Sequence, residues 1–259
     1  MIAEILYKFT ETAPNYVLAA GAICGLTAGT LVLLMRHSDK TTKVQRAYGA
    51  FWIAVIAGVG VWTTHFVAMI GFRPDASLYY DLRMTLFSIL VGILFIGLPL
   101  AASEFFRGWK NSRLLGCVAG LGVTAMHLTG MSALENCLPT FSPTMMGVAV
   151  TISMVFFAWA LKQSRRTVSG LIKKAIGISG GVCGLHFTAM ASVTLTEIEH
   201  QAGGLGANSL SILVVVIALS VFAITFIGTL NHRRRLVHQL MTHDESFPPA
   251  QRIVRTLRS

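Results

Sequence analysis

Long apolar stretches separated by short polar segments form the dominant pattern along this chain. Each of seven such stretches is long enough for an α-helix to cross about 30 Å of hydrocarbon at about 1.5 Å per residue. The stretches are continuous and do not alternate in polarity, so each segment satisfies its own backbone hydrogen bonds as a helix. We therefore predict an all-α integral membrane protein with spans at residues 16–35, 49–72, 84–103, 114–134, 144–161, 175–195 and 209–230.

The composition supports a membrane protein, because 54% of the residues are hydrophobic and only 12% are charged. We expect a short external N-terminus at 1–15, a membrane domain at 16–230 and a basic tail at 231–259. Residues 1–14 contain three charged side chains, and the first long apolar run leads into a basic loop without a small-residue cleavage site, so we expect no cleavable signal peptide. The first apolar stretch is then the first span.

The basic residues are concentrated on one side of the predicted membrane. The loops after spans one, three and five and the tail hold 18 of the 21 lysines and arginines, whereas Lys8, Arg73 and Arg83 lie on the other side. The positive-inside rule therefore places the N-terminus outside and the C-terminus in the cytoplasm. The net charge of +10 is explained by this topology and by contact of the basic residues with anionic lipid headgroups. We therefore expect no nucleic-acid partner.

One element, His-x-x-x-Met, recurs in the second, fourth and sixth predicted spans. Aligning the chain with itself at offsets of 62 and 59 residues superimposes His65, His127 and His186 and the methionines that follow them. These are the only histidines within the predicted spans. We interpret the chain as a two-helix hairpin repeated three times, followed by a seventh helix.

The spacing of the His-x-x-x-Met element allows its two side chains to bind one metal ion. Residues four apart on a helix lie on one face, so each histidine and its methionine can point toward one centre. The small residues Gly58, Gly120 and Ser179, seven positions before each histidine, are expected to let the three helices approach one another closely. Imidazole and thioether ligands without hard carboxylates suit copper, particularly the cuprous ion.

The four cysteines show no regular spacing, and three of them lie in apolar runs. In such runs a cysteine usually packs as a small hydrophobic residue. We assign no disulfide from the sequence.

The segments Thr64-His65-Phe66-Val67, Met126-His127-Leu128-Thr129 and Leu185-His186-Phe187-Thr188 resemble the MHYT domain family of bacterial membrane sensors, over nearly the whole chain. The resemblance implies a copper-binding module of the bacterial inner membrane that senses oxygen, carbon monoxide or nitric oxide. Such modules are often joined to cytoplasmic domains that make or degrade cyclic di-GMP. Carried over by position, the implied copper ligands are His65, Met69, His127, Met131, His186 and Met190, with Met126 as an additional candidate.

The tyrosine in the family's name is replaced here by Phe66, Leu128 and Phe187, while histidine and the later methionine are present in all three copies. Only 29 residues follow Leu230, so we expect an input module that is not itself an enzyme and that signals to a separate or fused cytoplasmic protein.

Two other functions are compatible with intramembrane histidines. Two of them could hold haem between helices in an electron-transfer protein. A copper or proton-linked transporter is a weaker alternative, because its ionisable residues would be distributed along the whole path. The simplest interpretation is that the histidines only bridge helices.

Overall fold

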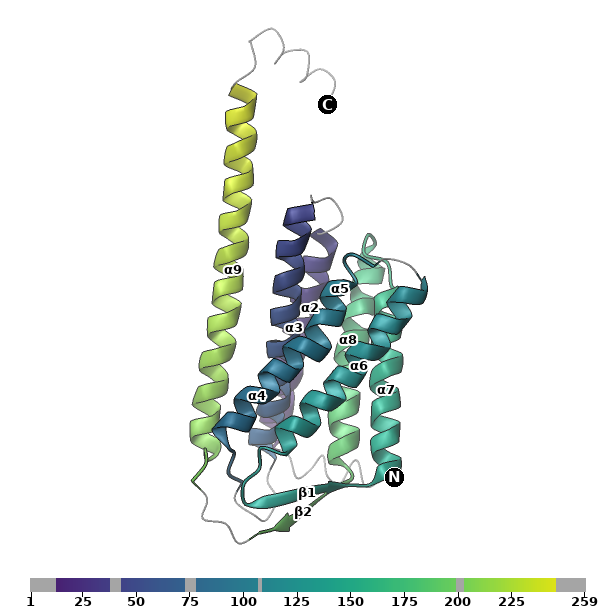
Figure 1. Cartoon of the computed structure of the whole chain (residues 1–259), viewed down its shortest axis with the longest axis vertical. Coiled ribbons are helices and arrows are strands. Elements are labelled where there is room, and N and C mark those ends of the chain that lie inside the picture. Colours follow the sequence, from purple (N-terminus) through teal and green to yellow (C-terminus); the bar gives the residue numbers. More distant parts are fainter. Residues whose placement is uncertain (1–12, 38–42, 73–77, 107–108, 199–202, 246–259) are drawn as a thin grey trace. The chain divides into compact units, whose positions relative to one another are not determined.

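The computed structural model describes residues 13–37, 43–72, 78–106, 109–198 and 203–245 (Figure 1). Within these residues, seven helical stretches are long and apolar enough to cross a membrane, as the hydrophobic pattern predicts. The helices are α2 (Pro14–His37), α3 (Lys43–Gly71), α4 (Leu82–Gly92), α5 (Leu98–Ala102), α6 (Trp109–Met131), α7 (Pro143–Lys162), α8 (Val168–Met190) and α9 (Ala207–Glu245). A π-helical segment, η2 (Ile93–Gly97), joins α4 to α5, so these three form the third span.

Residues 1–218 form one compact unit, and residues 219–259 form a second. The first unit contains all of α2 to α8 and the beginning of α9. All the sites described below lie in this unit.

The sixth span differs from its prediction. The pattern placed it at 175–195, whereas α8 begins at Val168, where the Thr167 hydroxyl accepts a hydrogen bond from the Gly170 amide, and ends at Met190. The predicted span begins later because Lys173 and Lys174 were assigned to a loop. Lys174 is nevertheless fully buried, and its Nζ donates to the Ala160 carbonyl in the last turn of α7, where the helix dipole favours a positive charge.

Four other helix ends differ from their predictions by three residues or more. α3 begins at Lys43 and not at residue 49. α6 begins at Trp109 and not at residue 114, and it ends at Met131 and not at residue 134. α9 continues to Glu245, beyond the predicted end at residue 230. Hydrophobicity alone does not mark the end of a helix, because a helix can continue beyond its apolar part.

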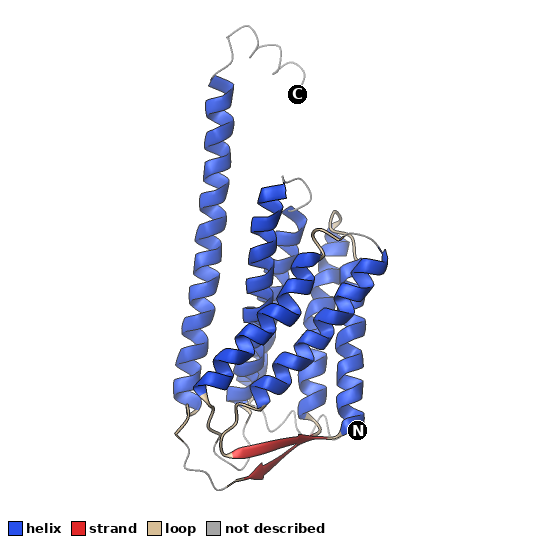
Figure 2. Ribbon diagram, in the orientation of Figure 1, coloured by secondary structure: helices blue, strands red, loops and turns tan. Residues whose placement is uncertain are grey.

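Two short strands correct the purely helical prediction. β1 (Cys137–Phe141) pairs antiparallel with β2 (Val193–Glu197), so that Cys137 is opposite Glu197 and Phe141 is opposite Val193. They join the loops that follow α6 and α8, across one end of these helices (Figure 2). The pairing connects segments more than 50 residues apart, which a local pattern cannot predict.

The small residues pack differently from our expectation. A Cβ placed on Gly58 would lie 2.4 Å from the Ile93 amide nitrogen in η2, and one on Gly120 would lie 2.7 Å from the Met154 Cα in α7. These glycines therefore bring α3 and α6 against neighbouring helices and not against each other. The helices that carry the three histidines meet instead through the imidazole rings.

Candidate metal centre

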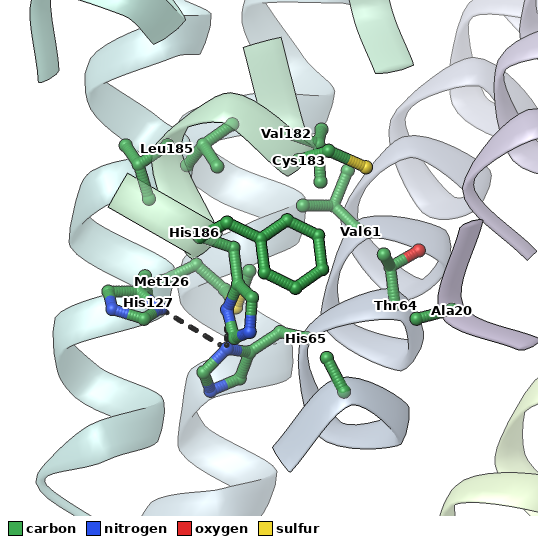
Figure 3. A pocket seen from close by; sticks show the side chains of 13 residues that line it. Ala20, Val61, Thr64, His65, Met126, His127, Val182, Cys183, Leu185 and His186 are labelled. Carbon is green, nitrogen blue, oxygen red and sulfur yellow. Dashed lines mark hydrogen bonds between the residues drawn. The ribbon is translucent and has the colours of Figure 1, made fainter. Parts of the chain in front are cut away.

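The three repeated histidines converge inside the first unit. His65 on α3 places its Nδ1 atom 3.2 Å from Nδ1 of His127 on α6 and 3.2 Å from Nδ1 of His186 on α8 (Figure 3). One ring nitrogen from each residue lies within 4.8 Å of the other two. The prediction that these histidines face a common centre is confirmed, and within the described residues this is the one cluster of three potential metal-ligating side chains found among His, Cys, Asp and Glu.

All three rings are buried. Their side chains are 3%, 1% and 7% exposed for His65, His127 and His186. Each pair of rings meets edge to face, with centroids 4.9 to 5.3 Å apart. Polar side chains at such positions in a membrane protein are costly and usually have a partner or a function.

Hydrogen bonds among the rings account poorly for this arrangement. A neutral imidazole carries one N–H group and one lone pair, and its Nδ1 has only one of them. His65 Nδ1 would have to share its single proton or lone pair between His127 and His186. A metal ion, in contrast, accepts one lone pair from each of three nitrogens.

Two of the three separations between the ring nitrogens also fit a metal ion. Two nitrogen ligands at about 2.0–2.1 Å from a tetrahedral first-row ion lie about 3.3 Å apart. The two observed Nδ1 separations of 3.2 Å are close to this value. Nε2 of His65 and Nε2 of His127 are buried without a hydrogen-bond partner among the described residues. Unpaired buried nitrogens are rare in native proteins, and an unseen water molecule or ion is one explanation for them.

The methionines occupy two different positions. Met69, Met131 and Met190 are all buried, and the last two are the final residues of α6 and α8. They do not line the small cavity beside the histidines, whereas Met126 does. The three histidines therefore meet in the structure, and the role of the three later methionines as ligands stays a prediction.

Aromatic residues enclose the histidines. The Phe141 ring of β1 lies 5.9 Å from the His127 ring, and the Phe66 ring packs 4.8 Å from His65 and 5.9 Å from Tyr80. The Tyr80 backbone is bonded to Leu205 by two hydrogen bonds, so the loops after α3 and α8 are tied together there. The strands and loops thus form a cap over the ends of α3, α6 and α8.

Sequence reasoning missed part of this site. Cys183, Thr64 and Val61 line the same cavity as the histidines. Thr64 directly precedes His65 in α3, and Cys183 lies three residues before His186 in α8. Residues three apart share a helix face, so a helical projection of α8 could have revealed Cys183. Phe141 could not have been found in this way, because only the β1–β2 pairing brings it to His127.

These features define a multi-pass membrane protein with a buried three-histidine centre. The chain matches the MHYT family, described as the N-terminal repeat of a bacterial signalling protein, over residues 58–117 and 180–240. Both matched segments begin in a histidine-bearing helix, seven residues before His65 and six before His186. The chain belongs to this family.

Three curated relatives support the family assignment. The chain is 31% identical over 196 residues to the cyclic di-GMP phosphodiesterase NbdA of Pseudomonas aeruginosa, with 70% of this chain and 24% of the relative covered. It is 32% identical over 187 residues to the bifunctional diguanylate cyclase/cyclic di-GMP phosphodiesterase MucR of the same organism, with 67% and 27% covered. An uncharacterized signaling protein of Caulobacter vibrioides is 30% identical over 194 residues, with 72% and 23% covered.

The chain thus spans about a quarter of the length of these relatives. No solved structure matches the chain. The relatives share the membrane region with this chain, so the three-histidine centre is to be interpreted in the context of bacterial signalling.

Proposed function

We propose that this chain is a membrane-embedded sensory input module that binds copper at His65, His127 and His186 and responds to a diatomic gas. The observation that carries this proposal is the presence of three buried ring nitrogens, from three helices, within 4.8 Å of one another. The module passes its signal to a cytoplasmic output and is not itself an enzyme. Copper, when bound, supplies a redox-active centre of the kind that proteins use for oxygen chemistry.

Copper is favoured over other metal ions by the available ligands. The three imidazoles and the nearby Met126 thioether are borderline to soft donors, and no carboxylate belongs to the cluster. Calcium and magnesium require hard oxygen ligands, whereas imidazole and thioether together suit copper. Met69, Met131 and Met190 lie four residues beyond the histidines and are retained in our proposed ligand set.

The cavity beside the histidines suits a small neutral ligand. It has room for about one water molecule and is lined largely by apolar side chains, including Val61, Val123 and Leu185. A diatomic gas is of comparable size and loses little hydration on entering an apolar site. A charged or large substrate would be disfavoured by the same surroundings.

The histidines connect three helices from different parts of the chain. Any change in the positions of their rings acts on α3, α6 and α8 together, because each ring contacts the other two. Signalling requires that the gas favour one of two arrangements of these helices. We propose that the tail after the seventh span conveys this change to a cytoplasmic signalling protein or to a fused cyclic di-GMP domain, as the names of NbdA and MucR suggest.

Haem is less suited to this centre. A haem held by two of the histidines would need a planar macrocycle between their rings, and Nδ1 atoms 3.2 Å apart leave no room for it. The absorption spectrum of purified protein distinguishes the two, since haem gives a Soret band and a mononuclear copper centre does not.

The direct test is metal analysis of protein purified without a histidine tag and loaded with copper. We expect copper bound at the centre, and a large loss of binding when His65, His127 and His186 are all replaced by alanine. The His232→Ala variant is the matched control, because it removes a histidine of the predicted cytoplasmic tail that is not one of the three repeated histidines. Undiminished copper in the triple variant, or zinc retained in preference to copper, would overturn the copper assignment.

A second test addresses the gas. Nitric oxide or carbon monoxide is added to copper-loaded protein, and the infrared stretch of the bound gas is recorded. We expect a copper-dependent band that is absent from the triple histidine variant. Copper-loaded protein without any such band, with oxygen consumption also absent, would remove the gas-sensing part of the proposal.

A further inference from the structure

A second group of soft ligands lies beside the histidines. Cys183 on α8 lines the same cavity as His186, and the thiol of Cys24 on α2 lies beside the same turn of α8, next to the Cys183 thiol. The two residues are 159 positions apart in the sequence. Both are free cysteines, and Cys24 is 3% exposed. Two thiols from different helices therefore meet inside the membrane-spanning part of the chain.

The surroundings of this pair are those of a defined site. The Cys24 sulfur lies 4.0 Å from the Ser179 carbonyl oxygen, one helical turn before Cys183 on α8. The Thr64 hydroxyl also interacts with Cys24, and Thr64 lines the shared cavity directly before His65. Figure 3 shows Cys183, Thr64 and His186 around this cavity. Cys183 is thus open to a guest in the cavity, with Cys24 next to it.

We propose that Cys24 and Cys183 form a second metal site, which holds a single cuprous ion between the two sulfur atoms. Cysteine sulfur is among the softest protein ligands and favours the cuprous ion. The two sulfurs belong to two neighbouring helices, α2 and α8. Each side chain can therefore approach the ion from its own helix. The neighbouring Thr64 hydroxyl and Ser179 carbonyl complete a polar lining for the site.

The charge of the bound site follows from its surroundings. A buried net charge is costly in a low-dielectric medium, so the favoured state has one thiolate, one neutral thiol and one monovalent ion. Binding then forms two Cu–S bonds and releases one proton to water. No electron is transferred, and both sulfur atoms remain at the thiol oxidation level.

The two metal sites are adjacent but chemically distinct. Cys183 precedes His186 by three residues, which is about 4.5 Å of rise along α8. The thiol site selects a soft monovalent ion, whereas the imidazoles also accept divalent ions. The cysteine site does not require that the histidines bind copper, so each can be tested without the other.

The test is an anaerobic titration of purified, reduced protein with Cu(I), and with Ag(I) as a monovalent ion that is not readily oxidised. We expect the Cys24→Ala/Cys183→Ala variant to bind one equivalent less of either ion than the wild type. Cys117→Ala is the matched control, because Cys117 is a free cysteine in α6 that is not part of the pair. The control variant is expected to keep the wild-type stoichiometry.

Copper X-ray absorption on the folded wild type provides a measurement that needs no variant. We expect sulfur neighbours at about 2.3 Å, a typical metal–thiolate distance, in addition to nitrogen neighbours at about 2.0 Å. In the His65, His127 and His186 triple alanine variant, the nitrogen signal is expected to fall and the sulfur signal to remain. This result separates the two sites, and it would support the cysteine site even if the histidines bound no copper.

Three outcomes would overturn the cysteine site. The first is equal stoichiometry in the double-cysteine variant and the wild type. The second is a sulfur signal at about 2.3 Å that is undiminished without Cys24 and Cys183, which would assign all of it to methionine. The third is a mass loss of two hydrogens in the copper-treated wild type, which would show that the two thiols had formed a disulfide.

Discussion

Replacement of Gly130 by alanine tests whether the positions of the histidines control metal binding. Gly130 lies in α6 three residues after His127, and a Cβ placed there would be 2.6 Å from Nε2 of His65 and 3.5 Å from the Phe66 ring. An ordinary contact begins at 3.4 Å, so the His65 ring must move by about 0.8 Å, the difference between 3.4 and 2.6 Å. The ring has little room, because Phe66, His127 and His186 all pack against it.

The expected effects follow from the size of this shift. Functional sites tolerate displacements of about 0.5 Å, and disturbing the supports of a metal ligand typically costs 10–100-fold in affinity. We therefore expect Gly130→Ala to weaken copper binding by roughly 10–100-fold. Overpacking is also expected to destabilise the metal-free protein by about 1–3 kcal/mol. The assays are competition of copper against a chelator and thermal unfolding in detergent.

The control is Gly147→Ala in α7, where an added Cβ meets nothing within 4 Å. It should keep wild-type copper affinity and gain slightly in helix stability. The same position in the other two copies holds Ala68 and Ala189, so the sequence alone would suggest that alanine is harmless here. Wild-type copper affinity and stability in Gly130→Ala would refute the reasoning, because they would show that His65 is free to move.

Three other predictions concern packing, charge and topology. Gly97→Ala places a Cβ 2.1 Å from the Ala54 carbonyl oxygen and should lower the unfolding temperature, whereas Gly25→Ala, with open space around it, should not. Arg165→Met removes one charged partner of the buried Glu104 carboxylate and should lower the free energy of unfolding, by at most about 3–5 kcal/mol, in chemical denaturation, and adding Glu104→Gln should recover part of the loss. A reporter fused after Ser259 should be cytoplasmic and one placed before Tyr16 external, because most basic residues lie on one side; a C-terminal reporter outside the cell would reverse the predicted topology.

The sequence by itself determined the membrane class, the seven spans and the three histidines. These depend on local properties, namely the length of apolar runs and the recurrence of one short element, which can be read without knowing where the helices lie. The helix ends were less well determined. Lys174 shows why: a charged residue was placed in a loop, but its ammonium group is buried where it can donate to the end of α7.

Only the tertiary structure decided what meets at the centre. The contact of Cys24 with Cys183, the packing of Gly130 against His65 and the position of Phe141 over His127 each join residues from different helices or strands. We predicted the wrong partner helices for Gly58 and Gly120, because a small residue indicates close approach of two helices but not which helix approaches. Helical periodicity determines on which face of its own helix a side chain lies. Long-range packing determines which other helix or strand that face contacts.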